Sequence, residues 1–164
     1  MKYLGKKSVS HILKIILNVF CVFGWLAFIG MLSASFNPIF LNYKNLLNTI
    51  FTAGILIIIL NIQFIIYQLR KITDTLIENN PFSISNVNKF RYIGYSVLFI
   101  GTFLLFKDIY FKGFHTLTIL DAGSDGVKTN IQVYLPFILG IFSLILSEIF
   151  KIAYKINEEN KLTI

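Results

Sequence analysis

Four long apolar stretches, separated by short polar segments, dominate the pattern of the chain. A transmembrane helix needs about 20 mostly apolar residues. By that measure the sequence predicts four spans, at about residues 15–34, 46–68, 92–111 and 131–154. The stretches are too long for buried strands, and they lack the ten-residue alternation of a membrane β-barrel. We therefore predict an all-α membrane protein, with residues 1–164 forming a single four-span domain.

Composition supports this prediction. Hydrophobic residues make up 55% of the 164 residues, and charged residues only 14%, against about 25% in ordinary soluble domains. A soluble chain of this length could not bury so much apolar surface. The lone Cys21 excludes an intramolecular disulfide.

The basic residues predict the orientation. The net charge is +7, and most of the 15 Lys and Arg residues lie in the N-terminal segment, between spans two and three, or after span four. Basic residues are enriched on the cytoplasmic side of membrane proteins. We expect a multi-pass plasma-membrane protein with both termini cytoplasmic. Its positive charge then faces anionic lipid of the bilayer, and no direct nucleic-acid contact is expected.

The two longer connections have distinct patterns. In residues 70–91, span two is expected to continue as a helix to about Glu78, to stop at Pro81, and to give way to a new helix capped by Ser83 or Ser85. Phe82 at the tip either packs back on the helices or contacts a partner. Residues 112–130 have strand-forming composition around a Gly-rich turn, which predicts a short extracytoplasmic hairpin or extended loop.

Glu148 is the strongest polar signal within a span, because ionisable residues there are costly. It can pair with Lys151 one turn on, or join a polar cluster at the inner helix ends. The alternatives are a ligand or proton role, and a position at the membrane interface where the side chain faces solvent. The inner-end residues that could partner it are Lys14, Asn18, Gln68, Arg70 and Arg91.

Other chemistry is sparse. Asn18, Asn61 and Gln63 are expected to hydrogen-bond between helices. The glycines form no GxxxG pair, so little close packing of small residues is expected. The sequence has no enzyme or cofactor motif and no cluster with metal-ligand spacing. We therefore expect no enzymatic activity, no cofactor and no metal.

Two motifs resemble a known family. Residues 80–94 read NPFSISNVNKFRYIG, and the C-terminal region contains LSEIF at 146–150 and NEENKLTI at 157–164. Together they resemble the YoaS-like group of small bacterial four-helix membrane proteins, a domain of unknown function. The resemblance implies a Gram-positive-type plasma membrane and a gene often located beside one for a small helix-turn-helix regulator. It directs attention to Pro81, Phe82, Asn86, Arg91, Glu148, Glu159 and Asn160 as a partner-binding or inner polar cluster.

Two functions follow as hypotheses. The first is an interaction or regulatory protein that docks a cytoplasmic partner such as a transcription regulator. The alternative is a small transporter or channel subunit, which requires a homo-oligomer with Glu148 facing a cavity. On the first hypothesis, the tail is expected to fold back so that Glu158 or Glu159 approaches the segment 81–91. Acidic residues at a helix C-terminus oppose its dipole, and this arrangement would explain them.

Overall fold

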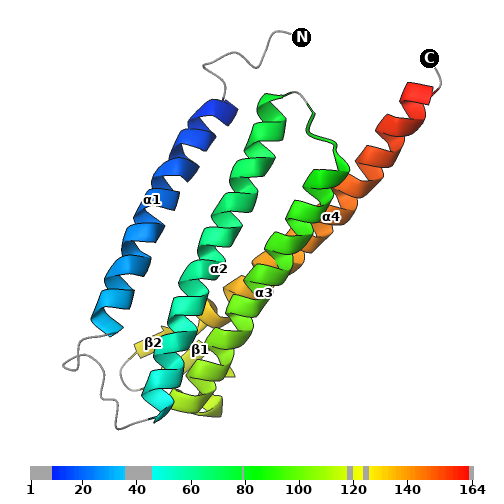
Figure 1. The fold of residues 1–164 in the computed structure, drawn as a ribbon. Coiled ribbons are helices and arrows are strands. Elements are labelled where there is room, and N and C mark those ends of the chain that lie inside the picture. The colour runs from blue at the N-terminus through cyan, green and yellow to red at the C-terminus, as the bar shows by residue number, and fades with distance from the viewer. Residues whose placement is uncertain (1–8, 36–45, 79, 118–119, 124–125, 163–164) are drawn as a thin grey trace.

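The computed structural model describes residues 9–35, 46–78, 80–117, 120–123 and 126–162. Four long helices form the body of this part of the chain (Figure 1). A short 3₁₀ helix and a two-stranded ribbon connect the last two. The elements are α1 (Val9–Ser35), α2 (Leu46–Ile77), α3 (Ile84–Lys112), η1 (Phe114–Leu117), β1 (Leu120–Gly123), β2 (Gly126–Thr129) and α4 (Ile131–Leu162).

All four long helices are long and apolar enough to cross a membrane, which confirms the predicted helical architecture. Each is also longer than the apolar stretch that predicted it. The helix α4, for example, runs on to Leu162 instead of ending near Tyr154. Periodic apolar residues locate the core of a span, but a helix continues into polar sequence until a cap or a breaker ends it.

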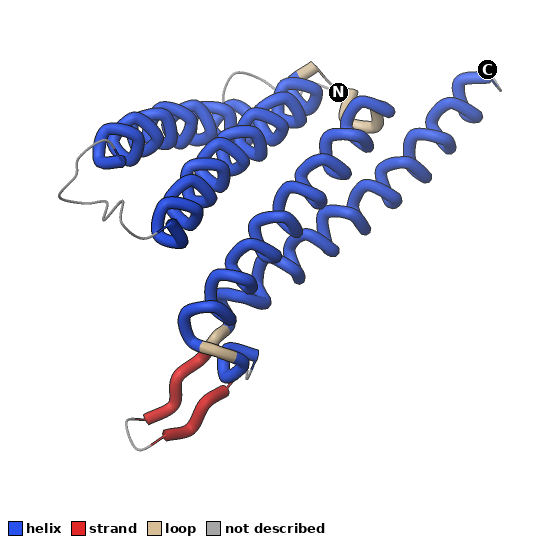
Figure 2. The backbone as a smooth tube through the Cα atoms, turned by 60° about the horizontal axis from the view of Figure 1, so that its bottom comes forward, coloured by secondary structure: helices blue, strands red, loops and turns tan. Residues whose placement is uncertain are grey.

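The helices are arranged in sequence order. Among the described residues, α1 packs on α2, α2 packs on α3, and α3 packs on α4. The α3–α4 contact is the most extensive of the three. Figure 2 shows the α1–α2 pair splayed away from the α3–α4 pair. The two edge helices, α1 and α4, therefore do not close a ring, and the helix ends beside the α2–α3 connection do not all meet at one point (Figure 2).

Close approach of small residues holds α3 against α4. A Cβ built on Gly140 would lie 3.2 Å from the Gly94 carbonyl oxygen and 2.7 Å from Leu98 Cγ. Ser143 and Ser147 donate hydrogen bonds to the carbonyls of Phe90 and Val87, both at 2.9 Å. The expectation of little small-residue packing was wrong, because the small residues face each other from two helices and not as a GxxxG pair on one.

The connection between α3 and α4 contains an antiparallel ribbon. In its register, Leu120 lies opposite Thr129 and Gly123 lies opposite Gly126. The ribbon extends from the end of the α3–α4 pair that is remote from the α2–α3 connection (Figure 2). Gly113 ends α3 with a φ of 75°, a left-handed conformation that glycine adopts at little cost.

Candidate functional site

The α2–α3 connection is fixed by the side chain of Asn86. Asn86 is fully buried, at 0% exposure. Its Nδ2 donates to Thr75 Oγ1 at 2.6 Å and to the Pro81 carbonyl at 2.8 Å. Ser83 is the N-cap of α3, as one of the two predicted choices, and its Oγ accepts from the Asn86 backbone N–H. Asn86 thus ties the end of α2, the connection and the start of α3 together, and its side chain faces no partner surface.

Lys89 extends this network. Its Nζ donates to Asn86 Oδ1 at 3.0 Å and to the Lys71 carbonyl at 3.4 Å, and the residue is only 9% exposed. A buried ammonium is costly unless its protons are bonded. Asn86 therefore satisfies a buried charge in addition to closing the hairpin, a role that the sequence motif alone did not reveal.

Phe82 packs against α4 while keeping part of its surface open. Its ring centroid lies 5.8 Å from that of Phe150, which in turn lies 4.8 Å from Phe90. Phe82 remains 43% exposed. Pro81 is half-buried beside it. Of the two alternatives considered for Phe82, the contact with the helices is formed, and enough surface is left for a further contact.

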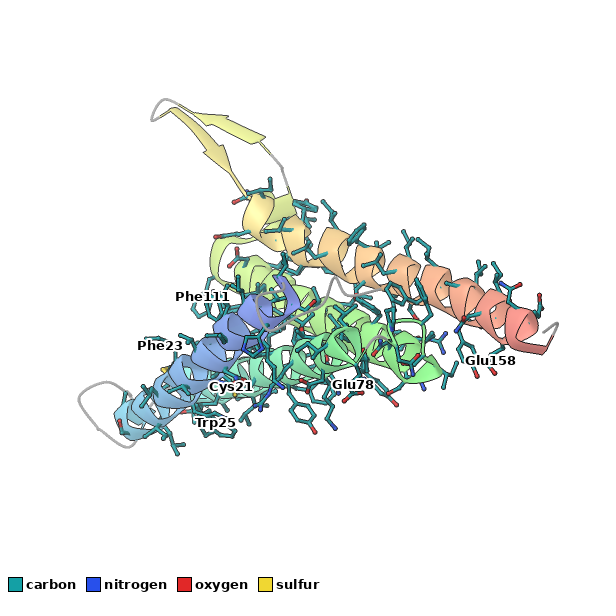
Figure 3. The ribbon with its side chains drawn as sticks, turned by 90° about the horizontal axis from the view of Figure 1, so that it is seen from above. Cys21, Phe23, Trp25, Glu78, Phe111 and Glu158 are labelled. Carbon is teal, nitrogen blue, oxygen red and sulfur yellow. The ribbon has the colours of Figure 1, made fainter. Side chains whose placement is uncertain are left out.

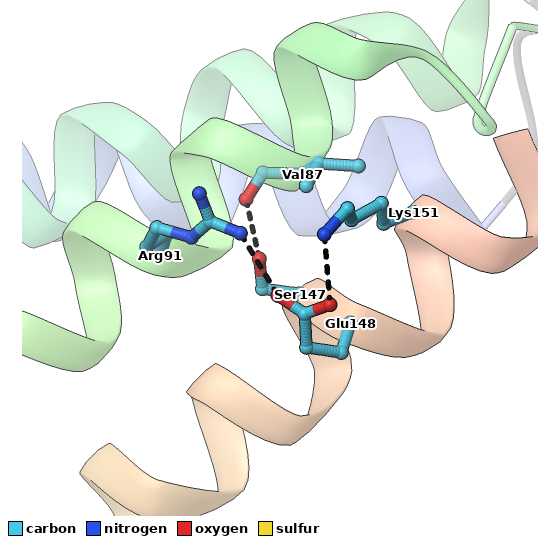
Figure 4. A network of polar contacts seen from close by, with 5 residues as sticks. All are labelled: Val87, Arg91, Ser147, Glu148 and Lys151. Carbon is cyan, nitrogen blue, oxygen red and sulfur yellow. Dashed lines mark hydrogen bonds and ion pairs between the residues drawn. The ribbon is translucent and has the colours of Figure 1, made fainter.

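Glu148 joins α3 to α4 at their surface. Its Oε1 lies 2.9 Å from Arg91 Nη2 and its Oε2 lies 3.2 Å from Lys151 Nζ (Figure 4). Its side chain is 57% exposed, in contrast to the neighbouring Ser147, which is buried. The carboxylate thus acts as a bridge between two cations on the surface. Exposed ion pairs of this kind contribute modestly to stability.

A second ion pair lies at the same end of the molecule but belongs to other helices. Lys14 Nζ of α1 lies 2.6 Å from Asp74 Oδ1 of α2. The predicted cluster, in which Glu148 gathers several inner helix ends, is therefore divided into an α1–α2 pair and an α3–α4 pair. Sequence reasoning missed Asp74. The sequence signal that could have revealed it is a carboxylate in the last turns of α2, paired with a lysine in the first turns of α1.

A polar contact also joins α1 and α2 within the apolar region. Gln63 Nε2 donates to the Cys21 carbonyl at 3.1 Å, and Gln63 is only 6% exposed. Gly24 leaves room for this amide, since a Cβ there would lie 1.8 Å from Nε2. The expected helix–helix hydrogen bond is thus formed by Gln63, to a backbone carbonyl of the neighbouring helix.

The described part of the C-terminal motif, residues 157–162, does not fold back. The helix α4 continues through residues 157–162, and Figure 3 places Glu158 near its far end. Glu159 and Asn160 are exposed there. The expected return of the tail beneath the helices is wrong, because the helical backbone continues in a straight line past Lys155.

No group of three or more His, Cys, Asp or Glu residues that could hold a metal ion occurs within the described ranges. The side chain of His115 lies outside the described residues. The polar contacts found at the end of the helices that carries the α2–α3 connection are those of helix pairing and of a capped connection.

These features define, within the described residues, four apolar helices joined in pairs by polar contacts. The model of the family described as "Protein of unknown function (DUF2975)" matches residues 33–164, from the end of α1 to the C-terminus. The chain belongs to this family, which confirms the resemblance to a group of unknown function. No curated protein and no solved structure matches the chain.

Proposed function

We propose that this chain is an integral protein of the bacterial plasma membrane that docks a cytoplasmic protein and has no enzymatic activity of its own. Helices α1–α4 cross the bilayer, and the α2–α3 connection and both termini lie in the cytoplasm. The β1–β2 ribbon lies on the outer side. The proposal rests on three features: the apolar helix surfaces, the distribution of basic residues, and the length of α4.

The helix surfaces support insertion. Large aliphatic and aromatic side chains stand exposed along the helices, as Phe23 at 65% and Ile138 at 61% illustrate. Contiguous exposed apolar surface of this extent is not typical of a soluble monomer. Lipid can cover this surface without leaving backbone N–H and C=O groups unpaired, because each helix satisfies its own backbone hydrogen bonds.

The basic residues support the orientation. Lys14, Arg70, Arg91 and Lys151 come from four different helices, and all lie toward the end that carries the α2–α3 connection. The end that carries the β1–β2 ribbon has few basic residues in its sequence. Enrichment on one side is the pattern that sets cytoplasmic location.

The main support for docking is the part of α4 that extends beyond the start of α3. Phe150 lies level with the start of α3, since its ring contacts both Phe82 and Phe90. The twelve residues that follow extend α4 by about 18 Å at 1.5 Å per residue. On this projecting part, Ile152 and Ile156 are 59% and 53% exposed, one helical turn apart. Exposed apolar residues one turn apart on a projecting helix are typical of helix-in-groove recognition.

The class of partner comes from the family resemblance. A small helix-turn-helix regulator bound to this helix would be held at the membrane. Binding and release would then control its access to DNA. DNA contact then belongs to the regulator and not to this chain. The half-exposed Phe82 lies at the same end of the molecule and extends the apolar surface available to such a partner.

A photo-crosslinking amino acid at position 156 tests the docking proposal in native membranes. We expect an adduct with a soluble DNA-binding regulator, identified by mass spectrometry, and expect Ile152→Ser to abolish it. The matched control places the crosslinker at Ile138, which is also well exposed on α4 but lies in the span, where only lipid adducts are expected. Lipid adducts alone at both positions, or adducts with a second copy alone, would contradict the proposal.

A further inference from the structure

A groove between α1 and α2 opens on the apolar surface of the molecule. Its volume is about 260 Å³. Its walls are aromatic and aliphatic, with one amide. They are formed by Cys21, Trp25, Leu60, Gln63, Phe64 and Tyr67. The polar contact from Gln63 to the Cys21 carbonyl crosses between the two helices here and fixes their separation. The groove is therefore suited to a narrow apolar group such as an acyl chain.

Two cations lie at the inner end of this groove. One turn beyond Tyr67, Lys71 Nζ lies 4.8 Å from the centroid of the Tyr67 ring. Arg70 lies three residues from Tyr67, on the same side of the helix. Both residues are exposed, and within the described residues neither forms an ion pair with a carboxylate.

Within the described residues, several other cations at this end of the molecule are already paired with carboxylates, whereas Arg70 and Lys71 are not. Lys14, Arg91 and Lys151 each lie within 4.0 Å of a carboxylate oxygen. The face of α2 that carries Arg70 and Lys71 also carries Asp74, whose partner Lys14 is on α1, so this face is directed toward α1. The groove and the unpaired cations thus belong to one helix interface.

We propose that this interface binds one anionic phospholipid of the inner leaflet. An acyl chain lies in the groove against Trp25 and Phe64, and the phosphate is bound by Arg70 and Lys71. Gln63 and Lys71 are eight residues apart, or about 12 Å along α2. The apolar groove and the two cations are therefore spaced along the helix in the same order as the acyl chain and the phosphate of a phospholipid. Basic residues between transmembrane helices on the cytoplasmic side are suited to anionic headgroups. This inference rests on the proposed insertion of the helices.

The only tryptophan of the chain reports directly on the site, because Trp25 lines the groove. The protein is placed in nanodiscs that contain either brominated phosphatidylglycerol or brominated phosphatidylcholine at equal bromine content. Bromine quenches tryptophan only at contact distance. General lipid contact with the half-exposed Trp25 quenches equally in both, so an excess with phosphatidylglycerol measures specific binding.

We expect this excess in the wild-type protein and expect it to disappear in the double variant Arg70→Gln/Lys71→Gln. Each basic residue near an anionic headgroup strengthens binding about fivefold, and the pair therefore about thirtyfold. The matched control is Lys155→Gln, an exposed cytoplasmic-end lysine on α4, which should retain the excess. Equal quenching by both lipids in the wild type, or an excess that survives the double variant, would overturn the proposal.

The test separates the lipid site from the proposed topology. Both leaflets of the nanodisc have the same composition, so a protein inserted in the opposite orientation would still give the excess. Orientation is measured independently by cysteine labelling in cells. Circular dichroism of the double variant confirms that it is folded, as expected for two exposed positions.

Discussion

Replacing Asn86 by Ala removes few atoms but should lower the free energy of unfolding substantially. The change removes two donated hydrogen bonds, to Thr75 Oγ1 and to the Pro81 carbonyl, and one accepted from Lys89 Nζ. A neutral hydrogen bond contributes about 1 kcal/mol and one to a charged group about 1.5–3 kcal/mol. The three together predict a loss of about 3.5–5 kcal/mol, because the site is fully buried and water cannot replace the lost bonds.

The assay is reversible unfolding in mixed micelles of increasing dodecyl sulfate content, followed by helical circular dichroism. Asn88 provides the matched control. It is the same residue type two positions away, but it is exposed. We expect Asn88→Ala to change the free energy of unfolding by less than about 0.5 kcal/mol, the usual range for exposed positions.

A double-mutant cycle isolates the contribution of the buried charge. Lys89→Met removes the ammonium that Asn86→Ala leaves with only its 3.4 Å contact to the Lys71 carbonyl. The double variant should therefore lose less stability than the sum of the single variants. A loss for Asn86→Ala no larger than that for Asn88→Ala, or strictly additive effects in the cycle, would refute the assignment of Asn86 to the closure of the hairpin.

Two further predictions concern the contact between α3 and α4. Gly140→Ala should lower the free energy of unfolding by about 1–3 kcal/mol, since its Cβ would crowd Leu98 and a backbone carbonyl, whereas Gly30→Ala, with nothing within 4 Å, should cause no loss. Glu148→Gln should lower the midpoint of thermal unfolding in detergent less than Glu148→Leu, because an amide still bonds to Arg91, and both should lower it less than Gly140→Ala. Unchanged stability in both Glu148 variants, together with lost biological activity, would favour a ligand or proton role.

The sequence was sufficient for the helices but not for their pairing. The number, order and approximate centres of the four helices follow from apolar length alone, because a helix is a local structure. The N-cap at Ser83 was also predictable, since capping depends on neighbouring residues. The open order of the helices was not, because apolar side chains cover most faces of each helix and give no signal of which face meets a neighbour.

The polar contacts show the same limit. Asn86 stands in a segment that reads as an exposed connection, and its burial depends on how α2 and α3 pack around it. Lys14 and Asp74 are 60 positions apart in the sequence, so their ion pair follows only from the antiparallel packing of α1 and α2. The straight course of α4 past Lys155 depends on the absence of a breaker, which outweighed the unfavourable acidic residues at its end.

Cysteine labelling in intact cells tests the proposed four-span topology most directly. In a Cys21→Ser background, Ser124→Cys probes the segment that links β1 to β2, and Ser83→Cys probes the connection between α2 and α3. We predict that an impermeant thiol reagent labels the cysteine at position 124 in intact cells and labels the one at position 83 only after the membrane is opened. The reverse pattern, or labelling of both positions in intact cells, would contradict the cytoplasmic location of the docking helix.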